Sequence, residues 1–258
     1  MMKKPSPKHV VIQSTHAVTP NMQRITFQSD SLREFPANCA GSYIKLLFTP
    51  SGSTDLSLLG PDDRPTMRTY TIRQFDAQTG TIEVDFVRHI TQDLQCGFAA
   101  RWAMNAEVGE SIAIAGPGTI QEMNIEADWF FMTADMTALP ALSAKIKQLP
   151  SDATGYAVIK VISEQDIQPI EAPENVQVHW IFEQDDLATA ARELEWLKGK
   201  ASVWCACEFD SMRGLRQYFR NDKGIDREHI YISSYWKKGV AEDGHKVIKR
   251  QDAEENEG

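Results

Sequence analysis

The chain has 258 residues, 42% of them hydrophobic, and this length favours two domains that each bury a core of their own. A formal net charge of −9 and a pI near 5.2 argue against nucleic acid and anionic membrane surfaces as partners. No run approaches about 18 apolar residues, and the basic N-terminus lacks the apolar segment of a secretory signal. We therefore expect a cytoplasmic protein that does not bind membranes.

Short strand patterns separated by turn residues follow one another from residue 8 to about residue 115. This spacing predicts an N-terminal antiparallel six-stranded β-barrel. A loop rich in Gly, Ser, Pro and Asp is expected at 49–65, and apolar residues at helical intervals predict a helix within 97–107. The six predicted strands are 9–18, 22–29, 42–48, 67–75, 81–89 and 110–116.

From residue 129 onward, strand patterns alternate with helix patterns. Such alternation predicts a C-terminal α/β domain with a parallel sheet covered by helices. The predicted domains are 1–122 and 123–240, followed by a tail at 241–258 whose acidic end, "QDAEENEG", we expect to be disordered. One helix is expected to carry Leu187, Leu194 and Leu197. The predicted strands are 129–134, 155–162, 176–182, 202–209 and 229–236.

The four cysteines and six histidines show no metal-ligand spacing, so no metal site is predicted. Cys205 and Cys207 alternate in the strand pattern "SVWCACEF". We expect both to be small core residues that point to one face of a buried strand.

The hexapeptide "RTYTIR" at 68–73 places two arginines around a tyrosine. Because strand residues alternate, Arg68 and Tyr70 share one face, while Thr71 and Arg73 share the other. An arginine two positions from a tyrosine can hold a phosphate while the ring packs on a flat heterocycle, with Thr71 bonding its edge. A surface strand with cross-strand ion pairs would carry similar residues.

The segment "WFFMTADMTALPA" reads as a strand that runs into a helix. In open parallel sheets, ligands bind at the carboxyl ends of the strands, where a helix N-terminus can receive an anion such as a dinucleotide phosphate. Thr133, Ala134, Asp135 and Thr137 lie at this point. The segment has no GxGxxG, and Thr137 can equally be a plain helix cap.

Several motifs together carry a family resemblance. "RTYTIR", "VDFVRH", "GFAARWA" and "VGESIAIAGPGT" are followed in order by "ADMTALPA", "CACEFDSMRGLRQYFR" and "SSYWKKGVAED". This set resembles the siderophore-interacting protein family, ferric-siderophore reductases related to the ferredoxin reductases. The resemblance implies an FAD-binding barrel, an NAD(P)H-binding α/β domain and the reduction of ferric siderophores to release Fe(II).

The resemblance also implies roles for individual residues. The flavin would carry the chemistry, so no protein acid, base or nucleophile is required. A cationic pocket for the ferric siderophore is expected, although its lysines can equally be solvated surface residues. The implied FAD contacts are Arg68, Tyr70, Thr71, His89, Gly97, Phe98, Ala99 and Ala100; the implied substrate contacts are Lys45, Lys237 and Lys238. On the nucleotide side we expect Asp135 and Thr137, from their place at the strand-to-helix turn, and Trp236, which can pack at the nicotinamide side of the flavin or simply close the core.

Three positions depart from the family pattern. Ala100 stands where Ser or Thr is common, and Met136 stands where an acid is usual. Glu183 stands where an arginine is often found, and its carboxylate would repel the 2′-phosphate of NADPH, so NADH is favoured over NADPH. A ferredoxin-like donor is a further possibility. The alternative functions are a flavin reductase that serves a protein partner and a siderophore-binding protein without redox activity.

Overall fold

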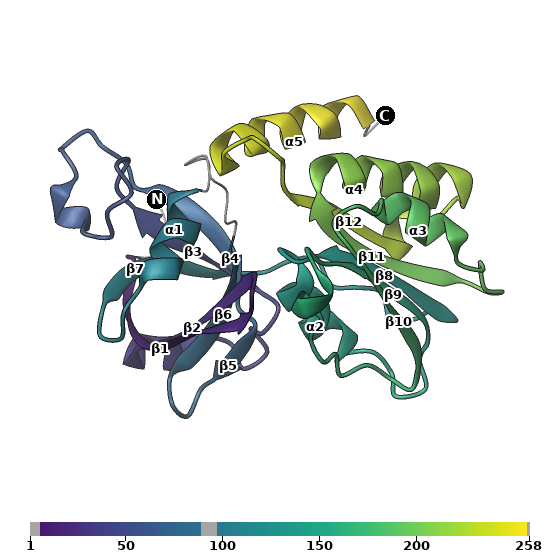
Figure 1. Ribbon diagram of the computed structural model, residues 1–258, viewed down its shortest axis with the longest axis horizontal. Coiled ribbons are helices and arrows are strands. Elements are labelled where there is room, and N and C mark those ends of the chain that lie inside the picture. Colours follow the sequence, from purple (N-terminus) through teal and green to yellow (C-terminus); the bar gives the residue numbers. More distant parts are fainter. Residues whose placement is uncertain (1–5, 89–96, 257–258) are drawn as a thin grey trace. The chain divides into compact units, whose positions relative to one another are not determined.

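A computed structural model describes residues 6–88 and 97–256 of the chain (Figure 1). The chain divides into two compact units, residues 1–120 (unit 1) and residues 121–258 (unit 2). Each unit has a sheet and a core of its own. None of the helices in the described part of the chain combines the length and the apolar character that crossing a membrane requires.

Unit 1 is built on a seven-stranded antiparallel sheet with the order β4-β3-β7-β1-β2-β6-β5. A helix, α1 (Phe98–Asn105), and two short 3-10 turns, η1 (Asp30–Glu34) and η2 (Leu56–Leu58), accompany the sheet. The strands are β1 (Lys8–Thr19), β2 (Met22–Gln28), β3 (Tyr43–Phe48), β4 (Thr66–Thr71), β5 (Gln74–Asp76), β6 (Thr81–Val87) and β7 (Ser111–Gly118).

The six-strand prediction is wrong because the segment 67–75 forms two strands rather than one. The chain changes partners at Ile72 and Arg73: the amide of Ile72 donates to Ser42 O (2.8 Å), and the amide of Arg73 donates to Glu83 O (2.8 Å). β4 therefore pairs with β3 while β5 pairs with β6. Since β4 and β5 are the two edges of the sheet and are consecutive in the chain, the sheet curls round on itself.

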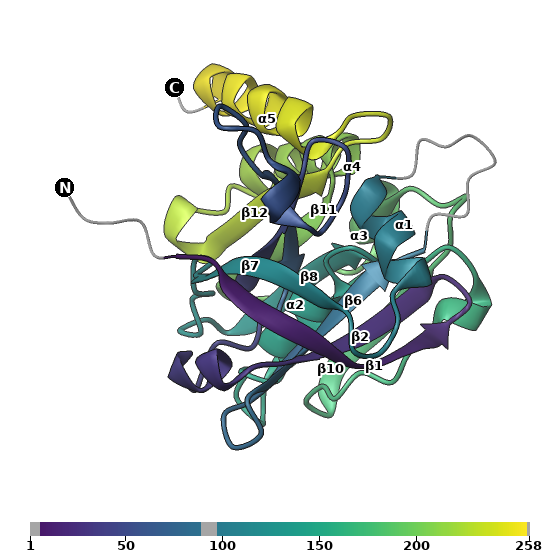
Figure 2. The same ribbon diagram turned by 90° about the vertical axis from the view of Figure 1, so that its left-hand side faces the viewer.

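Helix α1 packs against the curled sheet through Trp102 (Figure 2). The Trp102 ring stacks on Phe27, with centroids 6.2 Å apart, and meets the edges of Phe48 and Phe86 at 5.9 and 6.1 Å. Offset and edge-on aromatic pairs of this kind add to the stabilisation that comes from burying their area. The helix is thereby fixed beside the core of unit 1.

Unit 2 is built on a five-stranded parallel sheet with the order β10-β9-β8-β11-β12. The predicted alternation of strands and helices is confirmed. The strands are β8 (Trp129–Asp135), β9 (Thr154–Lys160), β10 (Asn175–Ile181), β11 (Ala201–Glu208) and β12 (Ile230–Trp236). The helices are α2 (Leu139–Ile146), α3 (Leu187–Glu193), α4 (Phe209–Arg216), which continues as a π-helix η4 (Gln217–Asp222), and α5 (Glu242–Asn256), with 3-10 turns η3 (Glu164–Asp166) and η5 (Arg227–His229).

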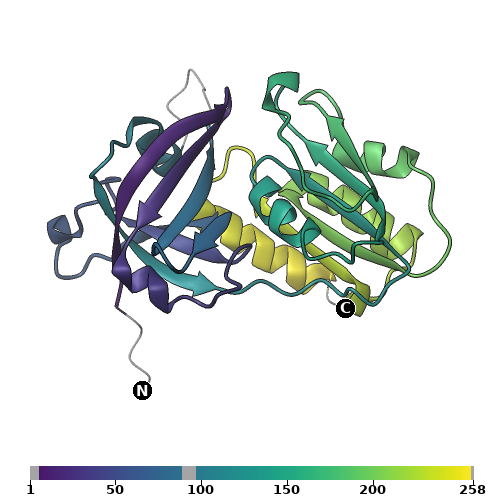
Figure 3. The same ribbon diagram turned by 90° about the horizontal axis from the view of Figure 1, so that it is seen from below.

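Helices cover both faces of this sheet, with α3 and α4 on one face and α2 on the other (Figures 1 and 3). Every residue of β8 is buried, as expected for a central parallel strand. Cys205 and Cys207 lie fully buried in the core of unit 2, which confirms that prediction. The carboxyl ends of β8 and β12 hold the predicted site residues Asp135 and Trp236.

Two helices differ from expectation. α3 ends at Glu193 because Leu194 is extended, and the apolar residues that follow reach the core without helix: Trp196 packs against Trp129 with centroids 4.7 Å apart. The acidic stretch expected to be disordered is instead helical as far as Asn256. Asp252 anchors it, because its carboxylate accepts two hydrogen bonds from the Arg216 guanidinium at 2.6 and 2.8 Å.

Candidate functional site

Strand β4 presents Arg68 and Tyr70 on the inner face of the curled sheet. The register places Arg68 opposite Leu46 and Tyr70 opposite Ile44. Residues directly opposite each other share a face, and both partners are fully buried in the core. The prediction that Arg68 and Tyr70 share a face is thus confirmed, and that face is the one on which α1 packs.

The side chain of Arg68 meets the beginning of α1. Its guanidinium carbon lies 4.6 Å from the centroid of the Phe98 ring, and Nη1 donates to Met67 O at 2.8 Å. Tyr70 packs beside the same core, with its ring centroid 4.4 Å from that of Phe86. Two sequence segments that were expected to contact one ligand, 68–71 and 97–100, therefore lie side by side.

The N-terminus of α1 carries no side-chain cap. Gly97 occupies the N-cap position, and the first turn contains no acidic residue. Gly97 is exposed, and a Cβ atom added there would meet no atom of the described residues within 4 Å. Ala99 and Ala100 are buried and offer only backbone groups. The uncapped end of a helix carries partial positive charge and favours an anion.

Other predicted residues of unit 1 lie elsewhere. Lys45 is opposite Thr69 in the register, so it lies on the face opposite Arg68 and Tyr70, with its Nζ 5.9 Å from the Tyr43 ring centroid. The Thr71 side chain also lies on that outer face. His89 lies outside the described residues. Lys45 on β3 and Arg68 on β4 thus lie on opposite faces of the sheet.

The second arginine of the hexapeptide has a structural partner. Arg73 Nε lies 3.0 Å from Asp85 Oδ2, and Arg24 binds the same carboxylate through two hydrogen bonds of 2.7 and 2.9 Å. The Asp85 side chain is 2% exposed. A buried carboxylate needs such partners, so Arg73 holds β4–β5 to β6. Cross-strand ion pairing, the alternative explanation of "RTYTIR", is correct for this arginine.

At the carboxyl edge of the unit 2 sheet, Asp135 joins the ends of three neighbouring strands. Its Oδ1 accepts hydrogen bonds from the amide (2.9 Å) and the hydroxyl (2.6 Å) of Thr137 and from the amide of Ala138 (3.3 Å). Its Oδ2 accepts from the amide of Glu208 (2.8 Å) and from Trp236 Nε1 (2.7 Å). β8, β11 and β12 are thereby tied together by one carboxylate.

This arrangement changes the expected role of the "ADMTALPA" turn. Neither Asp135 nor Thr137 caps α2, whose N-cap residue Ala138 makes no side-chain capping bond. The Asp135 carboxylate instead holds the turn before α2, so the amides of Thr137 and Ala138 already have an anionic partner within the protein. Burial raises the pKa of Asp135, while the hydrogen bonds from Thr137, Trp236, Ala138 and Glu208 oppose that rise. Asp135 therefore acts by holding a neighbouring side chain in place: its hydrogen bond to Nε1 fixes the orientation of the Trp236 indole.

The beginning of α4 is capped by the side chain of Glu208. Glu208 Oε2 accepts from the amides of Asp210 (2.5 Å) and Ser211 (3.3 Å), and Oε1 accepts from the amide of Lys238 (3.1 Å). Lys237 Nζ forms an ion pair with Asp210 at 3.0 Å and lies 4.6 Å from the Phe209 ring centroid. Both predicted substrate lysines of unit 2 are thus tied to the start of α4.

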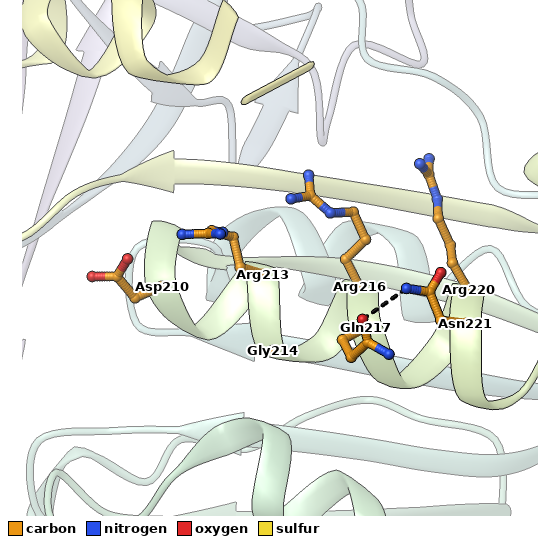
Figure 4. A pocket seen from close by; sticks show the side chains of 7 residues that line it. All are labelled: Asp210, Arg213, Gly214, Arg216, Gln217, Arg220 and Asn221. Atoms are coloured by element: carbon orange, nitrogen blue, oxygen red, sulfur yellow. Dashed lines mark hydrogen bonds between the residues drawn. The ribbon is translucent and has the colours of Figure 1, made fainter. Parts of the chain in front are cut away.

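A polar hollow of ≈ 430 Å³ lies along α4 and contains none of the predicted site residues (Figure 4). Three arginines project from this helix and its continuation, and one of them, Arg216, is paired with Asp252 of α5. The hollow is a solvated helix flank with α5 docked beside it. Its lining residues are Asp210, Arg213, Gly214, Arg216, Gln217, Arg220 and Asn221.

Lys160 was not predicted as a site residue. It ends β9 directly opposite Ile181 of β10, and its Nζ donates to Asp185 O at 2.6 Å. Glu183, exposed just after β10, therefore shares this corner of the sheet with a cation. The only sequence signal was a lysine that interrupts the apolar strand pattern "GYAVIKVI".

Two family models match the chain. The model of a siderophore-interacting FAD-binding domain matches residues 11–121, and that of a siderophore-interacting protein matches residues 127–239. Among curated relatives, ferric vibriobactin reductase ViuB of Vibrio cholerae is 32% identical over 243 residues, which cover 88% of each chain.

Solved structures agree with these matches. The siderophore-interacting protein SipS of Aeromonas hydrophila superposes with a TM-score of 0.83 at 28% identity and covers 96% of this chain and 98% of its own. A mutant ferredoxin-NADP+ reductase of Plasmodium falciparum superposes with a TM-score of 0.63 at 16% identity, covering 89% of this chain and 96% of its own. The latter likeness shows a ferredoxin reductase-like fold.

Proposed function

The chain belongs to the siderophore-interacting protein family, and from this premise we propose that it is an FAD-dependent oxidoreductase that reduces ferric siderophores and releases Fe(II). Iron(III) in such chelates is held by hard oxygen ligands, and reduction to Fe(II) weakens that preference. Iron is thus the substrate and leaves with each turnover. The curated relative named above carries a reductase name, which supports the same reaction here.

FAD fits the inner face of unit 1. Arg68 supplies a guanidinium that suits a phosphate, and the beginning of α1 beside it supplies uncapped backbone amides. Tyr70, on the same face, supplies an aromatic surface for a flat ring. When bound, FAD provides hydride acceptance from a nicotinamide and one-electron transfer to iron. The chain's own residues then bind the cofactor, orient it and exclude water.

The single observation that carries this proposal is that the Arg68 guanidinium and the uncapped end of α1 lie together in unit 1. Residues His89 and Thr71 are further proposed FAD contacts, Thr71 through its backbone. Asp135 is proposed to act by holding the Trp236 indole at the nucleotide edge, with Thr137 beside it.

For the electron donor we propose NADH. Glu183 is exposed at the end of β10 and disfavours a 2′-phosphate, although Lys160 offsets part of that charge. A ferredoxin-like protein donor is the second candidate. Lys45, Lys237 and Lys238 are proposed substrate contacts, and Lys237 would exchange its partner Asp210 for an anionic chelate.

The test is anaerobic reduction of a ferric hydroxamate by the purified protein reconstituted with FAD. NADH, NADPH and a reduced ferredoxin are supplied separately, and Fe(II) is trapped by a chromogenic chelator. We expect a flavin spectrum and Fe(II) formation above the rate given by free FAD at the same concentration. A colourless protein that takes up no FAD, or a rate equal to that of free FAD, would contradict the proposal.

A further inference from the structure

A cluster of three potential metal ligands lies at the amino end of β12, in the 3-10 turn that precedes it. Asp226, Glu228 and His229 each offer one ligand atom, and these atoms all lie within 4.8 Å of one another. Because β12 rises about 3.3 Å per residue, the cluster lies roughly 20 Å from the carboxyl edge of the sheet that holds Trp236. It is therefore separate from the nucleotide edge of unit 2.

The histidine carries the unusual feature. The His229 side chain is 4% exposed, and among the described residues its Nδ1 has no hydrogen-bond partner. The nearest acceptor is Glu228 Oε1 at 3.6 Å, too far for a hydrogen bond. A buried polar atom without a partner is costly and rare in native proteins. This atom faces the Glu228 carboxylate, the position where a cation would satisfy both groups.

The two carboxylates are able to close on an ion. The Glu228 side chain is 73% exposed and Asp226 is exposed, so both can shift without disturbing the core. Asp226 occupies the N-cap position of η5 but makes no side-chain capping bond. Ligand atoms around a four-coordinate Zn²⁺ lie roughly 3.4 Å apart, given metal–ligand distances of about 2.0–2.2 Å, so a small inward movement completes the set.

We propose that Asp226, Glu228 and His229 Nδ1 bind a divalent transition-metal ion of borderline softness, the class to which Zn²⁺ belongs. One imidazole nitrogen with two carboxylate oxygens suits this class, and water fills the remaining positions. The sequence prediction of no metal site relied on spacing between cysteines and histidines, and a site with one histidine and two acids escapes that rule.

The second ring nitrogen of His229, Nε2, faces Asn124, and this contact provides a specific test of the proposal. Asn124 Oδ1 accepts from the amide of Glu126 (2.9 Å), so Asn124 Nδ2 is the atom that faces His229 Nε2, at 3.0 Å. Donation from this amide leaves Nε2 unprotonated and puts the ring proton on Nδ1. A metal at Nδ1 needs the opposite tautomer, so metal binding by the wild-type protein also requires the Asn124 amide to turn and offer Oδ1 to the Nε2–H.

An aspartate at position 124 provides that acceptor. Its carboxylate can accept from both the Glu126 amide and the His229 Nε2–H, as in the carboxylate–histidine–metal arrangement of many metal sites. Asn124→Asp is therefore expected to tighten metal binding about tenfold, since outer partners of this kind change metal affinity by roughly 10- to 100-fold. A residue that only contributed to packing would not produce this gain.

The experiment is calorimetric titration of Zn²⁺ into the FAD-loaded full-length protein without a polyhistidine tag. Wild type is expected to show one saturable site and a rise in melting temperature on metal addition. Asp226→Asn and Glu228→Gln are each expected to weaken that site at least about tenfold, since each removes one charged ligand. Glu255→Gln, an exposed acid elsewhere, serves as the control and should bind as wild type.

Several results would overturn the proposal: no saturable site in the wild-type protein, equal weakening in Glu255→Gln, or wild-type affinity in Glu228→Gln. Unchanged or weaker binding in Asn124→Asp would also refute it, because the tautomer requirement would not hold. None of these readouts involves reductase activity, so the outcome is independent of the proposed function.

Discussion

Helix α1 in unit 1 and helix α4 in unit 2 begin in different ways. In unit 1, α1 starts at Gly97 with no side-chain cap among the described residues and no acid in its first turn, and Arg68 lies next to it. In unit 2, α4 starts against a carboxylate of the protein itself, because Glu208 accepts from the amides of Asp210 and Ser211. A helix end that is already neutralised offers little to an anionic ligand, so the comparison favours the beginning of α1 over that of α4 for the proposed phosphate contact.

The largest expected effect concerns Asp135, which ties the strand ends of unit 2 together. In Asp135→Asn, the amide oxygen can still accept from the amides of Thr137 and Ala138, but the NH₂ group must face the Glu208 amide and the Trp236 N–H, which are both donors. Unpaired buried donors cost about 1–3 kcal/mol each, so we expect a loss of about 3 kcal/mol in the free energy of unfolding, measured by denaturant titration.

The matched control is Asp186→Asn at the beginning of α3. Asp186 caps the Thr189 amide at 2.7 Å, and Asn caps helices as well as Asp, so a change within about 0.5 kcal/mol is expected. Equal stability of the two variants would show that Asp135 does not hold the strand ends together.

The next effect concerns the uncapped beginning of α1 in unit 1. Arg68→Ala removes a charge-assisted phosphate contact worth about 1.5–3 kcal/mol, and we expect FAD affinity to fall by about 10- to 150-fold in a flavin fluorescence titration. Arg64→Ala, in the exposed loop before β4, removes an equal charge and should leave the affinity near wild type. An equal loss of FAD affinity in both variants would mean that Arg68 contributes only its net charge and not a specific phosphate contact.

A substitution at the N-cap can also give α1 the capping carboxylate that it lacks. Gly97→Asp places a carboxylate at the α1 N-cap, where an added Cβ atom meets no atom of the described residues within 4 Å. It should stabilise the protein without FAD by about 0.5–1 kcal/mol, because it caps the helix, and weaken FAD binding about tenfold, because it repels the phosphate. Gly97→Ser supplies a neutral cap and is expected to weaken binding less. Stronger FAD binding in Gly97→Asp would contradict the difference drawn between α1 and α4.

A smaller effect concerns the charge at the nucleotide edge of unit 2. Glu183→Arg should raise the NADPH-to-NADH ratio of kcat/KM by about tenfold, since it replaces repulsion of a 2′-phosphate with attraction. Asp152→Arg, an exposed acid between α2 and β9, makes the same charge change away from that corner and should leave the ratio unchanged. An unchanged ratio in Glu183→Arg would remove the basis for favouring NADH.

The smallest effect concerns α5, which docks on unit 2 through His245. Its Nε2 lies 2.9 Å from Ser234 Oγ, and burial, followed by the nearby charge of Lys249, lowers the pKa of His245 below 6.5. Because the unfolded chain then binds a proton more readily than the folded one, this stabilisation is complete above pH 6.5 and is lost as the pH falls through the folded pKa.

Hydrogen exchange of the α5 amides between about pH 5 and pH 7 measures this dependence once the intrinsic rates are subtracted. We expect α5 to become less protected as the pH falls in wild type and to lose that dependence in His245→Gln. His16→Gln, on the exposed side of β1, should behave as wild type. If the protection of the α5 amides depended on pH identically in all three proteins, a titratable group other than His245 would be responsible.

Much of the architecture follows from local pattern, and the exceptions have physical causes. Strand alternation correctly placed Arg68 and Tyr70 together, because register fixes the face of every side chain. The division of 67–75 into β4 and β5 was missed, because a change of strand partner depends on Ser42 and Glu83, which are distant in sequence. The continuation of α5 into the acidic stretch after residue 250 was missed, because that stretch docks through the polar contact of Asp252 with Arg216, and its composition was read as disorder.

The site shows the same limit. Residue type marked Asp135 and Arg73 as notable, but a carboxylate that holds strand ends together and one that meets a ligand look alike in sequence. The roles of Arg73 and Trp236 depend on Asp85 and Asp135, which lie 12 and 101 positions away along the chain. Only the packed structure brings these groups within bonding distance.

The change of partners at Ile72 has one further consequence. The curled sheet closes within four residues of Arg68, so β4, the strand proposed to contact FAD, also forms the seam where the two edges of the sheet meet. A slip by one residue would turn every side chain to the wrong face and open the seam at once. Ligand entry and exit should therefore leave β4 unmoved, and its amides should exchange equally slowly in the empty and the loaded protein.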